Sequence, residues 1–583
     1  MGKGKKRMKT RRIVKQFRHR SPYELWMVIV VVLAVLLRFL LIYYHHPMTN
    51  SDEGNMGLEA LHIAFYGDHP IFFYGLPYMG PVEAYLAAPL FYFFGPSVFM
   101  LRLALLPFHA GFLIGVYYLV RLLYTERFAL ASVILLGLGS SAVIFLQLMA
   151  VGEYPEIEMF AALICLITLS LALSSHLQRE ERGKRIVLYG VLGLIIGVAL
   201  WVDFLIGPFV GMGLLLLCLF CHRELLRWCG LSLLLGIITG ASPLIYYNLT
   251  APIDQNSWNI LLFIHHGGSN LMAARHMTWL NQLSGTVMIS LPLATGANPE
   301  CPVNAFPPFG VPTSTTLPCV LFNGLWGVGY LVLWLVAFVA ALLVILRYLR
   351  YRRYRRSHAS LPDDAFQETA FERRQEMIRS CGRLVILVSV IVTIGLYAIS
   401  ASAAVYANSA YRYLALAILA MPIFLWPMWQ GLNLQNISLN WHRIGKVFIS
   451  GAFLLLIFGT FLVGMVRTFQ QIPADQAYYN SEQALIRDLR RIDATRIYSD
   501  YWTCNRLIFD TREKIICVGV GPNMKPGFNR YLPYIPIVQA APHPAYVFPS
   551  GSPLIPAFQQ HVASSHARYK EYRFDGYVVY VMT

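Results

Sequence analysis

Long apolar runs constrain this chain more than any other feature. Runs of about 18 or more apolar residues recur along its 583 residues, and the first extends from Trp26 to Tyr44. Hydrophobic residues make up 57% of the chain and charged residues only 13%. A soluble domain has about a quarter of its residues charged. The chain is therefore predicted to be a mainly α-helical, polytopic membrane protein.

The distribution of charge indicates which side of the membrane each loop occupies. The formal net charge is +17, and the first twenty residues carry ten Lys or Arg and no acid. Six more Arg lie within 347–356. Cytoplasmic loops of membrane proteins are rich in Lys and Arg, which also attract anionic lipids. We therefore interpret these clusters as cytoplasmic and expect no nucleic-acid partner.

Apolar runs and their basic flanks together predict about eleven spans, with the N-terminus inside and the C-terminus outside. Basic segments at 121–127, 179–185, 223–227, 347–356 and 442–446 alternate as this topology requires. The expected spans are 26–44, 98–120, 128–150, 157–175, 186–204, 205–221, 229–247, 320–346, 383–402, 413–430 and 446–466.

This topology divides the chain into three parts. They are a basic cytoplasmic tail (1–25), a transmembrane domain (26–466) with outer loops at 45–97 and 248–318, and an extracytoplasmic α/β domain (467–583). The first outer loop reads as helices lying in the membrane interface. In the last part, 481–492 is helical by pattern, and strands are expected at 496–502, 507–510, 514–520 and 576–581.

A stretch without cations marks the candidate site. Between Arg38 and Arg102 there is no Lys or Arg, although the chain is strongly basic. The stretch holds five carboxylates, and the adjacent pair Asp52 and Glu53 comes directly after the first span. This position predicts chemistry at the membrane face that needs a base.

Cysteine positions allow two disulfides. The chain has nine cysteines, and five of them lie in or beside the expected spans as small apolar residues. Cys301 with Cys319, and Cys504 with Cys517, lie in segments placed outside. An oxidising compartment would allow both pairs to form.

The order of several motifs resembles the GT-C glycosyltransferases, above all the protein O-mannosyltransferases and the bacterial aminoarabinose-to-lipid A transferases. The acidic pair after one N-in span resembles the family's first-loop motif. A weaker likeness lies in the tail, at 498–502 (YSDYW). The segments that carry the resemblance are 51–54 (SDEG), 78–86 (YMGPVEAYL), 93–97 (FFGPS), 101–103 (LRL), 152–156 (GEYPE) and 411–414 (YRYL).

The resemblance implies transfer of a sugar from a polyprenyl-phosphate carrier to a hydroxyl on the outer face, with inversion. The acceptor hydroxyl needs a base, and Asp52 is the candidate. Glu53 is expected to orient Asp52, bind the sugar or raise the pKa of Asp52 by its like charge. Arg102 and Arg412 are candidates to stabilise the leaving phosphate. Snorkelling to lipid head groups is the alternative for both arginines.

Further residues are candidates for contacts to sugar or acceptor. Glu83 lies in the first-loop motif, and Glu153 and Glu156 lie in the short second outer loop. Asp203 is either a functional carboxylate within an apolar run or part of a tight turn between two spans. His265 and His266 could touch phosphate or a metal. The sequence requires no cofactor, and a divalent metal stays an alternative.

A different class of protein also fits the membrane pattern, namely a transporter or flippase of lipid-linked sugars. Transporters usually carry ionisable residues near the midplane and repeat one half of the chain in the other. Here the carboxylates gather at the outer surface and the halves do not repeat. We therefore favour the enzyme, acting at the plasma membrane on a protein, lipid or glycan acceptor.

Overall fold

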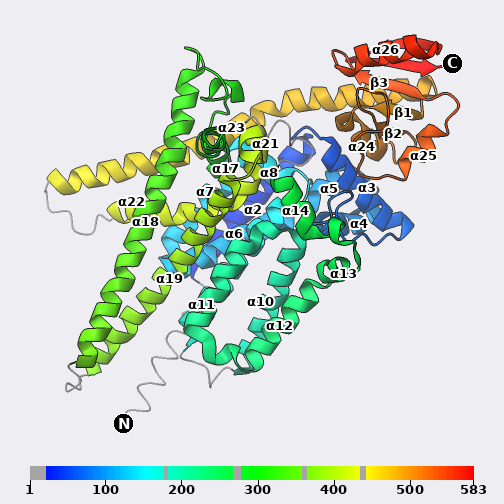
Figure 1. Cartoon of the computed structure of the whole chain (residues 1–583). Helices are drawn as coiled ribbons and strands as arrows, with labels where there is room; N and C mark the ends of the chain where they lie inside the picture. The colour runs from blue at the N-terminus through cyan, green and yellow to red at the C-terminus, as the bar shows by residue number, and fades with distance from the viewer. Residues whose placement is uncertain (1–20, 176–181, 267–276, 358–363, 433–440) are drawn as a thin grey trace.

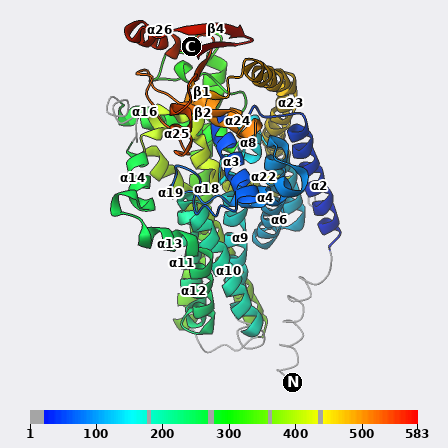
Figure 2. The same ribbon diagram turned by 90° about the vertical axis from the view of Figure 1, so that its right-hand side faces the viewer.

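The computed structural model describes residues 21–175, 182–266, 277–357, 364–432 and 441–583. These residues form a bundle of long helices with a small α/β domain at one end, here called the domain end (Figure 1). The opposite side of the bundle is called the far end here. The helix α2 (Pro22–Tyr43) begins on that side and runs toward the domain (Figure 2). The fold class predicted from the sequence is confirmed. Most of the predicted basic tail (1–20) lies outside the described residues.

Lipid offers no hydrogen bonds to the backbone, so a segment that crosses the membrane must satisfy its polar groups internally, as a long apolar helix does. Within the described residues, nine helices are long and apolar enough to cross a membrane, or up to eleven if each of two bent pairs is one span. The chain is thus a multi-pass membrane protein. The helices after α2 up to the second bent pair are α3 (Ser51–Tyr66), α4 (Val82–Phe94), α5 (Val98–Leu103), α6 (Leu106–Leu123), α7 (Glu126–Leu138), α8 (Ser141–Leu148), α9 (Tyr154–Leu173), α10 (Arg182–Val202), α11 (Gly207–Leu225), α12 (Trp228–Gly240) and α13 (Ser242–Thr250).

Two of the expected spans are broken helices. The expected span 128–150 is α7 and α8, which meet at 80°, and the span 229–247 is α12 and α13, which meet at 62°. Gly139 adopts φ +77° at the first break, and the Ser140 side chain caps α8 there. The remaining helices of the bundle are α14 (Ser257–His265), α16 (Trp279–Ser284), the π-helix η5 (Gly285–Ser290), α17 (Leu291–Thr295), α18 (Leu317–Ser357), α19 (Asp364–Ala398), α20 (Ser402–Val405), α21 (Ala407–Ala410), the 3₁₀-helix η7 (Tyr411–Ala420) and α22 (Met421–Gly431).

The helix α23 (Trp441–Arg491) joins the bundle to the domain as one continuous element of 51 residues (Figure 1). The boundary expected at 466/467 therefore lies inside a helix. The domain continues with β1 (Arg496–Ser499), α24 (Tyr501–Asp510), β2 (Ile516–Gly519), α25 (Tyr534–Gln539), β3 (Ala545–Pro549), α26 (Leu554–Ser565), β4 (Tyr569–Phe574) and β5 (Tyr577–Met582).

Its sheet has five strands in the order β2-β1-β3-β5-β4. The strand β1 pairs in parallel with β2 and β3, and β5 pairs antiparallel with β3 and β4. The strand expected at 507–510 is wrong, because these residues belong to α24. Asp500 caps that helix by accepting from the Thr503 backbone N–H at 3.1 Å and from the Thr503 hydroxyl at 2.9 Å. An alternation over four residues does not distinguish a strand from one face of a helix.

The domain rests on the bundle through a contact between α24 and α3. In Figures 1 and 2 the domain lies over α3 and α4, the two helices of the first loop. Gly54 of α3 lies so close to α24 that a Cβ there would be 2.5 Å from the Arg506 backbone nitrogen. A Cβ on Gly57 would meet the Phe509 ring at 2.6 Å. The helix α3 is therefore buried along most of its length.

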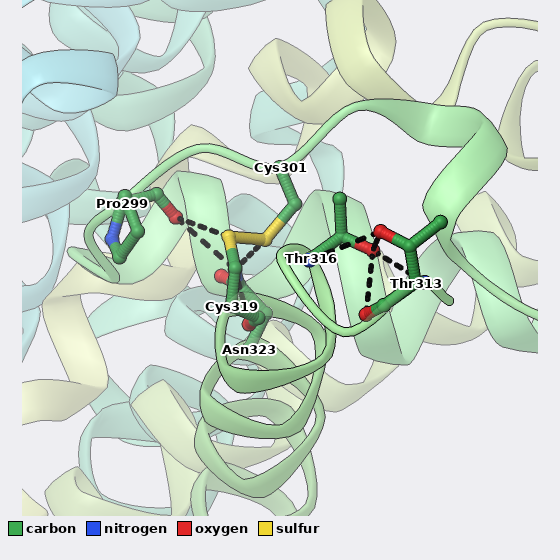
Figure 3. The surroundings of a disulfide bond; sticks show 6 residues. All are labelled: Pro299, Cys301, Thr313, Thr316, Cys319 and Asn323. Carbon is green, nitrogen blue, oxygen red and sulfur yellow. Dashed lines mark hydrogen bonds between the residues drawn. A yellow bond between two sulfur atoms is a disulfide. The ribbon is translucent and has the colours of Figure 1, made fainter.

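Two disulfides join the cysteines that the sequence paired. Cys301 is bonded to Cys319, which ties the segment before η6 (Val303–Ala305) to the start of α18 (Figure 3). The Asn323 side chain donates to the Pro299 carbonyl at 3.1 Å beside this bond. Cys504 is bonded to Cys517 and joins α24 to β2. The second bond fixes the helix that contacts α3 to the sheet.

The α3–α24 contact predicts that Gly54→Ala destabilises the protein, although alanine favours helices over glycine by about 1 kcal/mol. The added Cβ meets backbone atoms, which cannot rotate away, and overpacking typically costs about 1–3 kcal/mol. Gly211→Ala in α11 is the matched control, because no atom lies within 4 Å of its Cβ position. Thermal unfolding in detergent should show a lower Tm for Gly54→Ala only. Equal Tm values for the two variants would contradict this packing.

Candidate active site

The first turn of α3 places two carboxylates side by side at the domain end. Asn50 caps the helix by accepting from the Glu53 backbone N–H at 2.9 Å, so Asp52 and Glu53 lie in the first turn. Carboxylates are favoured there by the partial positive charge of the helix N-terminus. Both are buried, with Asp52 8% and Glu53 0% exposed. Each carboxylate has its own arginine, and the two pairs differ in geometry.

Asp52 receives all its hydrogen bonds on one oxygen. Arg530 donates to Asp52 Oδ1 through Nε at 3.0 Å and through Nη2 at 2.8 Å. The Tyr501 hydroxyl donates to the same oxygen. Among the described residues no donor reaches Asp52 Oδ2. This oxygen is therefore available to accept a proton from another molecule.

Surrounding charges keep Asp52 ionised. Burial by itself would raise the pKa of Asp52, because it removes water from the carboxylate. The charge of Arg530, the hydrogen bond from Tyr501 and the charge of Arg412 outweigh this and hold the pKa below its usual value. Asp52 is thus a carboxylate at neutral pH.

Glu53 forms a closed pair with Arg102. Arg102 donates through Nε to Glu53 Oε1 at 2.7 Å and through Nη2 to Glu53 Oε2 at 2.6 Å. The Ala150 backbone N–H also donates to Glu53 Oε1, at 3.2 Å. The Arg102 side chain is 1% exposed. The sequence made Arg102 a candidate for the donor phosphate and Glu53 a candidate to orient Asp52 or bind the sugar, and both roles stay predictions. In this structure the two side chains hold each other in place between α3 and α5.

Arg412 lies at the start of η7, near Asp52. Its guanidinium approaches the Tyr154 and Tyr413 rings at 5.9 and 5.4 Å. Its Nε is buried and has no hydrogen-bond partner among the described residues, while the residue as a whole is partly exposed. A buried donor without a partner costs about 1–3 kcal/mol. The role of Arg412 as a ligand of the donor phosphate stays a prediction.

The other four candidate carboxylates gather around the turn before α9. Glu153 occupies that turn in the left-handed conformation (φ 71°), which is strained for a residue with a side chain. Glu83 of α4 accepts from the Gly152 backbone N–H at 3.0 Å, and Glu156 lies beside it. Burial and then the neighbouring Glu156 charge raise the pKa of Glu83 well above its usual value. Burial and then the Asp203 charge do the same to the pKa of Glu153.

Asp203 lies in a turn between α10 and α11, which was one of its two expected placements. Its side chain caps the 3₁₀-helix η2 (Phe204–Ile206) by accepting from the Leu205 backbone N–H at 2.5 Å. Burial raises the pKa of Asp203 to about 7. Asp203 and Glu153 lie close enough for their charges to interact, and the Arg412 charge lowers the pKa of both.

His265 and His266 end α14, where the Ala401 backbone N–H donates to the His265 carbonyl at 3.2 Å. Within the described part of the chain they make no contact with Asp52 or its partners. No group of three or more His, Cys, Asp or Glu among the described residues could hold a metal ion. A cavity of about 710 Å³ between α22 and α23, lined in part by Met428, Lys446 and Ser450, is separate from this site.

Sequence reasoning missed Tyr501 and Arg530. Tyr501 stands in the YSDYW segment of the tail, which gave only a weak resemblance. Arg530 lies in the loop between β2 and α25, where no pattern marks it. Both meet Asp52 across more than four hundred residues of sequence.

The closed Glu53–Arg102 pair predicts that Arg102→Met lowers stability before it affects any chemistry. The variant leaves Glu53 buried without a countercharge, which costs about 3–5 kcal/mol. The double variant Glu53→Gln/Arg102→Met should recover most of that loss, because glutamine still accepts from Ala150 N–H. Unfolding in detergent measures both. If Arg102→Met is as stable as wild type but inactive, Arg102 acts as a ligand of the donor phosphate and not as a structural partner of Glu53.

No protein-family model and no curated protein matches this chain. Solved structures do match. ArnT from Cupriavidus metallidurans bound to undecaprenyl phosphate aligns over 95% of this chain and 98% of its own, with 15% identity and a TM-score of 0.51. The oligosaccharyltransferase AglB from Archaeoglobus fulgidus, in complex with an inhibitory peptide and a dolichol-phosphate, aligns over 96% and 74%, with 11% identity and a TM-score of 0.47. The likeness to ArnT shows that this chain has the fold of the GT-C membrane glycosyltransferases.

Proposed function

We propose that this protein is a glycosyltransferase that moves a sugar from a polyprenyl-phosphate carrier to a hydroxyl acceptor. The observation that carries the proposal is Asp52, a buried and ionised carboxylate whose Oδ2 is free, which is bonded to Arg530 and lies within reach of the Arg412 charge. The shared fold with ArnT, which was crystallised with undecaprenyl phosphate, supports a polyprenyl-phosphate donor. The sugar and the acceptor are left open.

The reaction is a single displacement with inversion. Asp52 Oδ2 accepts the proton of the acceptor hydroxyl, and the acceptor oxygen bonds to the anomeric carbon of the sugar. The bond between that carbon and the phosphate oxygen breaks, and its electron pair stays on the phosphate. Polyprenyl phosphate leaves with one more negative charge than it carried in the donor. No metal or further co-reactant is needed for this balance.

Arg412 stabilises the leaving group in this proposal. Negative charge develops on the phosphate during the displacement, and a preorganised donor is worth most where that charge appears. The unpartnered Nε of Arg412 is such a donor. Glu153 and Asp203 lie within reach of the Arg412 charge, with Glu83 and Glu156 beside Glu153, and the four are proposed to bind hydroxyls of the sugar or acceptor. The raised pKa values of Glu83, Glu153 and Asp203 let them donate as well as accept hydrogen bonds.

The site is proposed to face away from the cytoplasm, at the plasma membrane. The far end of the bundle collects basic residues: Arg121 pairs with Glu24 of α2 at 2.6 Å, and Arg383 of α19 donates to the Leu123 carbonyl at 3.0 Å. Arg185 pairs there with Glu224 at 2.6 Å. Basic residues favour the cytoplasmic side. The domain (467–583) and Asp52 at the other end then lie outside.

The base assignment predicts that Asp52→Asn abolishes transfer. Asparagine keeps the shape but cannot accept the proton, and loss of a general base typically costs about a hundredfold to ten-thousandfold in rate. Asp68→Asn is the matched control, because Asp68 lies in the same loop with its side chain 46% exposed. Rates of labelled sugar transfer from undecaprenyl-phosphate sugars, and unfolding curves, should be measured for both. If folded Asp52→Asn transfers sugar at the wild-type rate, Asp52 is not the general base.

A further inference from the structure

The C-terminal domain contributes two of the groups around Asp52, and their geometry differs from that of a structural ion pair. Arg102 and Glu53, one residue along the same helix, use both carboxylate oxygens and two guanidinium nitrogens in a closed fork. Arg530 instead directs Nε and Nη2 to the single oxygen Oδ1 of Asp52. The pair therefore stays open on both sides, with Asp52 Oδ2 and Arg530 Nη1 unused.

Arg530 Nη1 is a buried donor without a partner. The Arg530 side chain is 9% exposed, and its Nη1 has no hydrogen bond among the described residues. The bundle Arg102 shows that an arginine in this protein can be buried with an acidic partner. Leaving an N–H unpaired in such a place costs about 1–3 kcal/mol unless a ligand takes it.

Packing holds the Arg530 guanidinium in place. It lies over the Phe73 ring of the first loop at 5.0 Å, and over Phe528 and Tyr501 of the domain at 5.3 and 5.8 Å. Its Nε also donates to the Tyr501 hydroxyl at 2.6 Å. Contacts from both the bundle and the domain thus fix the direction of Nη1.

We propose that Arg530 is a ligand of the donor phosphate and that Tyr501 positions Asp52, so that the C-terminal domain completes the active site. Arg530 Nη1 donates to a phosphate oxygen while Nε and Nη2 keep Asp52 oriented. One planar guanidinium then donates hydrogen bonds to both the base and the leaving group, which arginine can do because its donors point in several fixed directions. This inference rests on the proposed function.

The charges in the site fit a phosphate. Asp52 carries one negative charge, and Arg412 and Arg530 carry two positive charges. The surplus positive charge matches the single charge of a phosphodiester donor. The product phosphate gains charge between the same two arginines, where it is stabilised most.

Binding of undecaprenyl phosphate to the full chain tests Arg530. Arg530→Gln should weaken binding about 10- to 100-fold, because one charge-assisted hydrogen bond is lost. Arg530→Lys should weaken it about tenfold, since lysine cannot serve Asp52 and phosphate at once. Arg573→Gln is the matched control, an arginine of the same domain whose side chain is 80% exposed. Its affinity should equal that of wild type.

Two further arms separate the possible failures. Undecaprenol, which lacks the phosphate, should bind wild type and Arg530→Gln equally, and inorganic phosphate should compete only weakly. If wild type does not prefer undecaprenyl phosphate over undecaprenol, the proposed function fails. If wild type shows that preference and both folded Arg530 variants retain it in full, Arg530 is not a phosphate ligand. Arg530→Lys keeps the pair with Asp52 and remains informative if Arg530→Gln does not fold.

Tyr501→Phe tests the positioning part. Tyr501, Arg530 and Arg412 are the groups that act on the Asp52 charge. The Tyr501 hydroxyl stabilises ionised Asp52, so its removal raises the pKa of Asp52. The acid limb of the kcat/KM profile should therefore move to higher pH, and kcat should fall with little change in KM. A profile that does not move would show that Tyr501 only packs.

Discussion

The contact between α3 and α24 is the interaction on which the rest of the site depends. Gly54 and Gly57 let the two helices approach until backbone meets backbone and ring. That approach brings Tyr501, at the start of α24, and the loop with Arg530 onto Asp52. The Cys504–Cys517 bond joins α24 to β2, so the sheet and the helix that contacts α3 are held together as one unit.

Two adjacent carboxylates on one helix turn have different parts because their arginines differ. Glu53 is satisfied on both oxygens by Arg102 and Ala150, so it anchors the first turn of α3 in the bundle. Asp52 accepts hydrogen bonds on Oδ1 only, so its side chain is held in place while Oδ2 stays available to a substrate. A closed pair contributes rigidity, and the open pair beside it leaves a reactive atom exposed to a substrate. The second arrangement needs the first, because a mobile helix turn could not keep Oδ2 in place.

Sequence analysis predicted the spans and several residues of the proposed site, namely Asp52, Arg412 and the four carboxylates around the turn before α9. Apolar periodicity located the spans, and a missing positive charge over 39–101 identified Asp52. Breaks within spans were missed, because hydropathy does not record a turn such as the one at Gly139. Arg102 was assigned by its place at a span end, which says nothing of its partner. Arg530 meets Asp52 across 478 residues, a contact that no local signal carries.

Sugar transfer itself is the most direct test of the proposed reaction. Purified protein in vesicles should be given labelled undecaprenyl-phosphate mannose, glucose or aminoarabinose with a hydroxyl acceptor, and the released sugar and its anomeric configuration should be measured. We expect release from one donor, with the configuration at the anomeric carbon inverted. Tight binding of the carriers without release from any of them would contradict the proposed reaction and would favour a transporter of lipid-linked sugars.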